Sequence, residues 1–288
     1  MLIADFLLVI ITIVWLIAAS VQDIRKREVA NWLCFSLLSI ALAVRAIAAI
    51  IFSSPFYFLY GLAGFAAFFC LANLLYYGRL FAGGDAKLFM ALGAALATYP
   101  VFAKTGGIII TPFLLIFLVN SLFIGSVYGI FFSIFLATKN RKKFAKEIKG
   151  KWKIGYSWFF VLFVLLVFFA FTSKIFFLNF LAFLFLVPYL FLFVKAVENS
   201  CMVRMLRPEQ ITEGDWLVNT LRIRTKKKII TIKPTWEGLS KKEIALIKKV
   251  KIKKVKIKYG VPFVPVFLLA LIASLFGNML FWLVSLIA

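Results

Sequence analysis

The sequence predicts an all-α polytopic membrane protein with about eight transmembrane helices and a small cytoplasmic α+β subdomain. Of its 288 residues, 64% are hydrophobic, and the mean hydropathy is +1.02; a soluble domain has roughly 45–50% apolar residues. The apolar residues form runs close to the roughly 20 residues that cross a bilayer. The basic residues gather between alternate runs, as in cytoplasmic loops. A soluble enzyme and a disordered chain are therefore excluded.

The apolar runs define the expected spans. The run over 86–103 is short and ends near Pro100, and the two runs within 155–197 could form one broken hairpin. The first run lacks the basic stretch of a signal peptide, so we expect it to be retained. The eight expected spans are 2–20, 31–52, 56–77, 86–103, 108–136, 155–172, 175–197 and 261–287.

The distribution of charge predicts which side each loop faces. The chain has 34 Lys and Arg against 11 Asp and Glu, a net charge of +23. Most of the basic residues follow the odd-numbered spans, so we expect these segments in the cytoplasm and both termini outside. This asymmetry explains the charge without a nucleic-acid partner. The basic segments are 21–30, 78–85 with Lys87, 137–154 and 198–260.

The composition also limits the chemistry. The chain has no histidine, which excludes His-based triads, His-ligated metals and imidazole acid–base catalysis. Cys34, Cys70 and Cys201 are scattered and form no CxxC pair. We therefore expect neither a metal nor a cofactor.

Residues 198–260 are the only segment between the spans that is large enough for a soluble subdomain. Alternating apolar residues predict strands over 216–224, 228–233 and 250–258. A capping box over 240–243 predicts a short helix between the last two. We expect this basic α+β subdomain to lie against the anionic inner leaflet.

Three aspartates lie in or beside the spans, where a carboxylate is costly and suggests a function. Asp5 is near the outer end of the first span. Asp23 follows the inner end of that span, and Asp85 opens the fourth span on the same side. Two carboxylates at one site can share a proton, so one can activate water while the other protonates a carbonyl. The alternatives are helix caps or cation pairs, or a proton- or ion-coupled transporter that uses the two Asp.

Three segments resemble the type IV prepilin peptidase family. Asp23-Ile-Arg-Lys-Arg-Glu-Val-Ala-Asn-Trp-Leu33 resembles its first catalytic segment, and Ala82-Gly-Gly-Asp-Ala-Lys-Leu88 resembles its second, of the GxGD type. Lys258-Tyr-Gly-Val-Pro-Phe-Val-Pro265 resembles the segment that leads into the family's last helix. The chain departs at Ala82, where the family has a first Gly, and at Ala30, where Pro often precedes the Asn.

The resemblance implies an aspartic endopeptidase at the cytoplasmic face of the plasma membrane. Its substrates would be precursors with type IV pilin-like signal peptides, cut after a short basic leader. Without a CxxC domain the chain looks like the archaeal preflagellin (archaellin) or prepilin branch, for which no methyltransferase activity is expected. Asp23 and Asp85 would be catalytic, and four neighbours would bind substrate or shape the loops: Gly83, Gly84, Lys87 and Asn31.

The resemblance and the charge pattern together suggest four parts. These are an N-terminal membrane domain with both catalytic Asp over 1–137, a basic loop and helical hairpin over 138–197, the basic subdomain over 198–260 and a last transmembrane helix over 261–288.

Two finer expectations concern the charged side chains. Asp85 lies at the positive end of its helix and Asp23 at the negative end of its own. This predicts Asp85 as the base and Asp23 as the acid. On the outer side, Arg45 and Asp5 lie on adjacent antiparallel spans, which predicts an ion pair, with outward snorkelling of Arg45 as the alternative.

Overall fold

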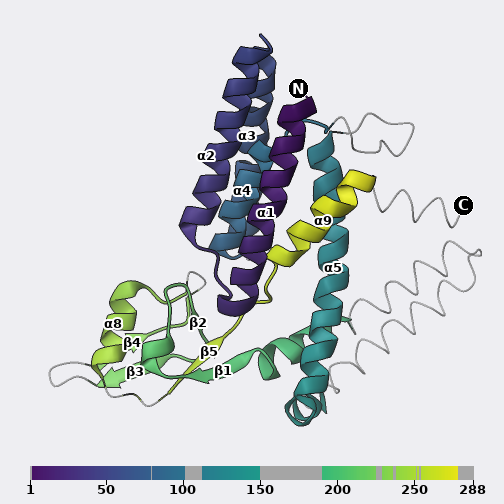
Figure 1. The fold of residues 1–288 in the computed structure, drawn as a ribbon. Helices are drawn as coiled ribbons and strands as arrows, with labels where there is room; N and C mark the ends of the chain where they lie inside the picture. Colours follow the sequence, from purple (N-terminus) through teal and green to yellow (C-terminus); the bar gives the residue numbers. More distant parts are fainter. Residues whose placement is uncertain are drawn as a thin grey trace, which may run out of the picture. The chain divides into compact units, whose positions relative to one another are not determined.

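The computed structural model divides into two compact units (Figure 1). The first comprises Met1–Gly129 and Gly260–Ala288, and the second Ile130–Tyr259. The residues that the structure describes are 2–78, 80–100, 112–149, 190–224, 229–235, 238–250, 252 and 254–277.

The first unit is helical. In Figure 1, helices α1 to α4 lie side by side, and α9 crosses beside α1. Among the described residues, α1, α2, α3 and α5 are long and apolar enough to cross a membrane. Large apolar side chains such as Ile3, Ile50 and Leu74 are exposed on the outer faces, as expected of side chains that contact lipid. The helices are α1 Leu2–Lys26, α2 Asn31–Ile51, α3 Pro55–Tyr77, α4 Gly83–Ala95, α5 Phe113–Lys139, which continues into the second unit, and α9 Val264–Phe276.

The first, second, third and fifth expected spans are confirmed as long apolar helices. The described part of the eighth forms α9, and residues 190–200, at the end of the seventh, are helical. The sixth span, most of the seventh and the end of the eighth lie outside the described residues. The fourth was predicted to reach residue 103, but its helix ends at Ala95.

Arg45 explains the early end of α4. This side chain is fully buried on α2. Its Nε donates to Ala94 O at 2.7 Å and its Nη2 to Ala95 O at 3.1 Å. The last carbonyls of a helix have no partner within the helix, so the guanidinium caps α4. Gly61 makes room for it, because a Cβ at this position would collide with Arg45 Cδ.

The predicted ion pair between Asp5 and Arg45 is wrong. In the described part of the chain the two are linked through hydroxyl groups instead. Tyr57 Oη donates to Asp5 Oδ1 at 2.7 Å, and Thr98 Oγ1 donates to the same oxygen at 3.2 Å. Arg45 Nη2 donates to Thr98 Oγ1 at 3.1 Å, and Nη1 donates to Tyr57 O at 3.2 Å. Arg45 also does not snorkel outward, since its donors all find acceptors inside the unit.

Two glycines let α3 and α4 approach closely. A Cβ on Gly64 would collide with Gly93 O, and a Cβ on Gly93 would meet Phe68 Cβ at 2.5 Å. Small residues at helix crossings are typical of membrane proteins. The contact fixes α4, and with it Asp85, against the rest of the first unit.

The second unit contains the expected small α+β fold. The strand predicted over 216–224 is found as two short strands, over 216–217 and 221–224, separated by residues 218–220. Strands β1, β5 and β2 form an antiparallel sheet in this order, and β3 pairs with β4. The elements are β1 Val203–Leu206, η2 Pro208–Gln210, β2 Trp216–Leu217, β3 Leu221–Arg224, β4 Ile229–Ile232, α8 Lys241–Lys249 and β5 Val255–Lys258.

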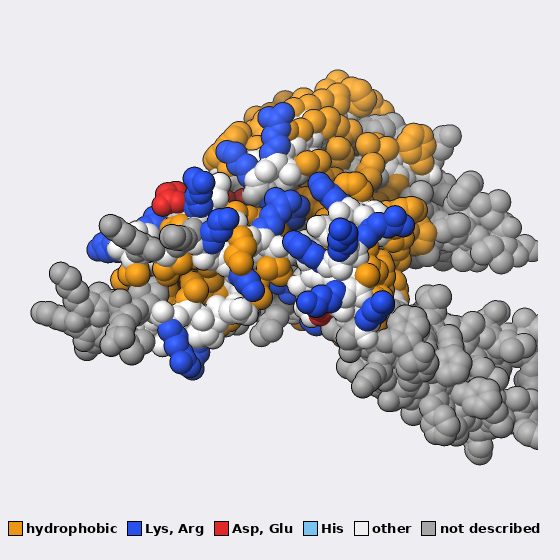
Figure 2. All heavy atoms as spheres, turned by 90° about the horizontal axis from the view of Figure 1, so that it is seen from below, with side chains coloured by type: hydrophobic (Ala, Val, Ile, Leu, Met, Phe, Trp, Pro, Cys, Tyr) orange, Lys and Arg blue, Asp and Glu red, His pale blue; other side chains and the backbone are white. Residues whose placement is uncertain are grey.

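The core of this fold is apolar and its charges lie outside. Ile244 and Ile247 of α8 belong to the same buried apolar cluster as Val255 and Ile257 of β5. Ser240 opens α8 with the predicted capping box, since Glu243 Oε2 accepts from Ser240 N at 2.9 Å. Figure 2 shows one face of the molecule on which Lys and Arg side chains are numerous and acidic side chains few.

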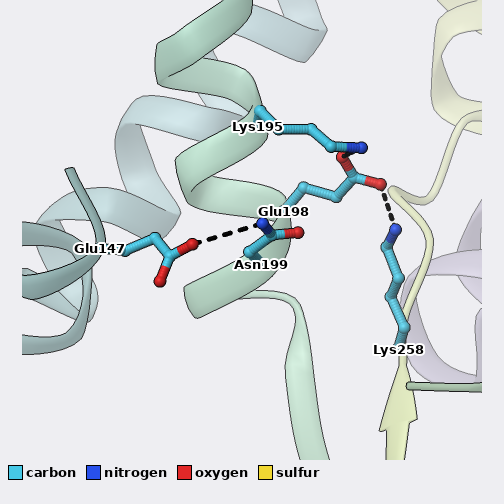
Figure 3. Close-up of polar contacts among 5 residues, drawn as sticks. All are labelled: Glu147, Lys195, Glu198, Asn199 and Lys258. Atoms are coloured by element: carbon cyan, nitrogen blue, oxygen red, sulfur yellow. Dashed lines mark hydrogen bonds and ion pairs between the residues drawn. The ribbon is translucent and has the colours of Figure 1, made fainter. Parts of the chain in front are cut away.

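A polar cluster joins β5 to the helix over 190–200 (Figure 3). Glu198 forms ion pairs with Lys258 of β5 and, at 3.0 Å, with Lys195. Asn199 donates to Glu147 at 3.3 Å, from the helix over 141–149. Burial alone would raise the pKa of Glu198, but the hydrogen bonds from Lys258 and Lys195 outweigh it and lower the pKa.

Candidate active site

Asp23 lies on the last turn of α1, on its buried face. The helix ends at Lys26 because Arg27 adopts a left-handed conformation with φ 57°, which is typical of helix C-termini. Asp23 Oδ2 accepts a hydrogen bond from Val264 N at 3.0 Å. Arg27 Nη1 donates to Gly260 O at 2.5 Å. Asp23 is therefore held by the segment that leads into α9.

Asp85 lies on the first turn of α4 and is also buried. Its Oδ2 accepts from Ala82 N at 3.3 Å, so it satisfies one of the free N–H groups at the start of its own helix. Ala82 itself has an extended backbone with φ −74°. This conformation does not require the glycine that the family pattern would place there.

The structure brings Asp23 and Asp85 together from separate helices. The two are close enough for their charges to interact. The chain after Asp23 also contacts the start of α4, where a Cβ on Gly84 would lie 3.2 Å from Val29 N and Val29 Cβ. Cys34 Sγ lies 3.8 Å from Gly84 O. The predicted convergence of the two acidic segments is therefore present in the fold.

The other predicted site residues lie on the same side of the unit. Gly84 provides the close approach just described, whereas a Cβ on Gly83 would make only an ordinary contact with Tyr76, at 3.8 Å. Lys87 Nζ donates to Asn31 Oδ1 at 2.8 Å. This bond joins the second turn of α4 to the first residue of α2. Asn31 and Lys87 therefore connect the two acidic segments.

Asn31 is the first residue of α2, and its side chain accepts from Lys87. It does not cap α2, whose N-cap is Ala30 and has no side-chain cap. The backbone of the loop is held by Gln22 Oε1, which accepts from Ala30 N at 2.9 Å. Ala30 has φ −65°, the value that proline imposes. The missing proline therefore does not change the local backbone.

The helix-end argument for different roles of the two aspartates does not hold. That argument considered only α1, whose negative end lies near Asp23. Asp23 also accepts an N–H at the start of α9, where Pro265 lies in the first turn. Both carboxylates thus face the positive end of a helix, and the geometry does not separate base from acid. Both aspartates also accept a backbone N–H at the start of a helix. This is the helix-cap role that the sequence left open as an alternative to catalysis.

The sequence reasoning missed several neighbours of the dyad. It noted the segment before Pro265 as a resemblance but gave Val264 no part in the site. Tyr128 of α5 is close enough to Asp23 to interact electrostatically. Ser20, three residues before Asp23, is buried as well. Pro265 could have signalled a helix start, with free N–H groups, near the dyad.

The arrangement has the groups that acid–base hydrolysis of a peptide needs. Two buried carboxylates, one charged and one protonated, can activate water and hydrogen-bond the carbonyl under attack. Among the described residues, no three Cys, Asp or Glu side chains form a group that could hold a metal ion.

Comparison with known proteins gives one match, which covers the segment with both aspartates. No curated protein and no solved structure matches the chain. Residues 10–130 match the model of the type IV leader peptidase family, and this segment contains both Asp23 and Asp85. Such peptidases are of the aspartic type and process prepilin-type precursors. Residues 10–130 of the chain are therefore similar to the type IV leader peptidase family.

Proposed function

We propose that the chain is a membrane aspartic endopeptidase that removes the short basic leader from archaeal preflagellin (archaellin) or type IV pilin-like precursors. The observation that carries the proposal is the meeting of two buried carboxylates, Asp23 and Asp85, from separate helices within the segment that matches the family.

In the proposed reaction one aspartate is ionised and the other is protonated. The ionised carboxylate takes a proton from water as the water oxygen bonds to the scissile carbonyl carbon. The protonated carboxyl donates a hydrogen bond to the carbonyl oxygen. The tetrahedral intermediate then collapses, the C–N bond breaks, and the leaving amine takes the proton that the first carboxylate removed from water, which restores the dyad. One water is consumed, and the products are a carboxylic acid and an amine.

The location of the site is part of the proposal. Arg25, Lys26 and Arg27 come soon after Asp23, and most Lys and Arg residues lie in the segments that follow the odd-numbered expected spans. Positive loops favour the cytoplasmic side, so we place the dyad at the cytoplasmic face of a multi-pass plasma-membrane protein. The substrate's basic leader would remain in the cytoplasm, and its apolar segment would lie against the helices.

The test is a cleavage assay on membranes that contain the full chain and candidate archaellin or pilin-like precursors. Asp23→Asn and Asp85→Asn should each abolish cleavage. Asp5→Asn is the matched control, because Asp5 is also a buried aspartate of α1 but lies away from the dyad. Mass spectrometry of the product should show an unmethylated N-terminus. Full cleavage by either dyad variant would refute the mechanism.

A further inference from the structure

The buried face of α1 carries four polar side chains, Asp5, Thr12, Ser20 and Asp23. Three of them have partners. Asp5 accepts from Tyr57, Thr12 donates to a backbone carbonyl, and Asp23 accepts from Val264 N. Within the described residues, Ser20 Oγ is the single fully buried side-chain oxygen or nitrogen without a hydrogen-bond partner.

The lack of a partner is unusual for a helical hydroxyl in this chain. A Ser or Thr within a helix often donates to the carbonyl four residues earlier. The carbonyl of Leu16 holds that position for Ser20, but no such bond forms. Five other helical hydroxyls of this chain do make this bond, namely those of Thr12, Ser121, Ser126, Ser200 and Ser274.

Ser20 is also close to the dyad. Residues three apart on a helix are neighbours, with Cβ atoms about 5–6 Å apart, so Ser20 lies one turn from Asp23 on the same buried face. A single water molecule can bridge groups at this separation, and buried waters bind where polar groups lack partners. The first residue of α9 contacts Asp23 at the same place.

We propose that Ser20 is a further residue of the active site, whose hydroxyl binds and orients the attacking water beside Asp23. This inference rests on the proposed peptidase function. The Ser20 hydroxyl accepts a hydrogen bond from one O–H of the water, while the ionised carboxylate of the dyad takes the other proton. Ser20 neither gains nor loses a proton, and it forms no covalent bond.

The experiment measures kcat and KM for cleavage of a leader-bearing precursor by the full chain, together with thermal unfolding. Ser20→Ala should lower kcat by roughly 3- to 10-fold, the effect of losing one hydrogen bond in the transition state. KM should change little. Ser20→Thr, which keeps the hydroxyl, should retain more activity than Ser20→Ala. Thr12→Ala is the matched control, a buried hydroxyl of the same helix with its own partner, and should keep the wild-type kcat.

Thermal unfolding separates this role from a structural one. Since Ser20 Oγ has no hydrogen-bond partner among the described residues, Ser20→Ala should leave the unfolding temperature unchanged or raise it. A fall in kcat without a fall in unfolding temperature supports the proposal. A wild-type kcat for Ser20→Ala overturns it, as does a loss of activity matched by a loss of stability. If Asp23→Asn is inactive in the same assay, such a result leaves the proposed peptidase function intact.

Discussion

The two ends of α4 hold buried charges in opposite ways. At its C-terminal end, Asp5 accepts from two hydroxyls, and Arg45 donates to carbonyls and to Thr98. At its N-terminal end, the carboxyl groups of Asp23 and Asp85 lie close enough to interact electrostatically, and each has a backbone N–H as partner.

The comparison teaches that a buried charge alone does not mark a functional site in a membrane helix. The hydrocarbon core offers no water, so a polar group there needs a protein partner. The network around Asp5 and Arg45 satisfies its members internally, which suits a structural role. The end with Asp23 and Asp85 also contains Ser20, whose hydroxyl has no hydrogen-bond partner in the part of the chain that the structure describes. Such a group can accept a water or a substrate.

The largest expected effect is a loss of activity at the N-terminal end of α4, to be compared with a loss of stability at its C-terminal end. Asp85→Asn should lower the rate of cleavage by about 100- to 10,000-fold, because it removes one partner of an acid–base pair. It should not lower the unfolding temperature, since it also removes a charge that faces Asp23. Cleavage assays and thermal unfolding in detergent measure the two quantities.

Asp5→Asn should show the reverse pattern, with cleavage kept and stability reduced by about 1–3 kcal/mol as its hydroxyl partners lose a charged acceptor. If Asp5→Asn and Asp85→Asn gave the same pattern, the two ends of α4 would not differ in role.

The next effect concerns stability at the C-terminal end of α4. Arg45→Met should reduce the free energy of unfolding by about 3 kcal/mol or more, because it leaves the buried acceptors of the guanidinium without their donors. Arg45→Lys should recover only part of this loss, since one ammonium cannot reproduce the planar donor geometry of the guanidinium. Denaturation in detergent measures both.

A double-mutant cycle with Asp5→Asn tests whether this end acts as one network. Asp5 and Arg45 share Tyr57 and Thr98 as partners, so their losses should not add. Strict additivity would show that the two residues are independent.

A smaller effect is expected at the Glu198–Lys258 pair of the second unit. Both side chains are partly exposed, so Glu198→Gln should cost less than about 1 kcal/mol at pH 7. The pKa of Glu198 is lowered from its ordinary 4.5. The contribution of the pair to the free energy of unfolding is therefore complete above pH 4.5. It is lost as the pH falls through the lowered pKa of Glu198. Unfolding of wild type and Glu198→Gln should converge in acid; a difference that grows in acid would contradict this.

The membrane helices and the acidic segments could be predicted from the sequence because charges are rare in apolar spans. Asp23 and Asp85 stand out for this reason. The early end of α4 could not be predicted, since it depends on Arg45, which lies about fifty positions earlier and caps Ala94 and Ala95. The contact of Val264 with Asp23 joins residues 241 positions apart, and no local pattern contains such a pairing.

The smallest expected effect concerns the loop after Asp23. Ala30 already has φ −65°, so proline fits the backbone at this position. Ala30→Pro should stabilise the fold by about 0.4–1 kcal/mol because it lowers the conformational entropy of the unfolded chain. It also removes the N–H that donates to Gln22 Oε1, a loss of about 0.5–1.5 kcal/mol. The net change in unfolding free energy should stay within about 1 kcal/mol. Gln22→Ala should cost stability in the wild type but not in the Ala30→Pro background, because the bond it removes is already absent there. An equal cost in both backgrounds would mean that this hydrogen bond does not hold the loop.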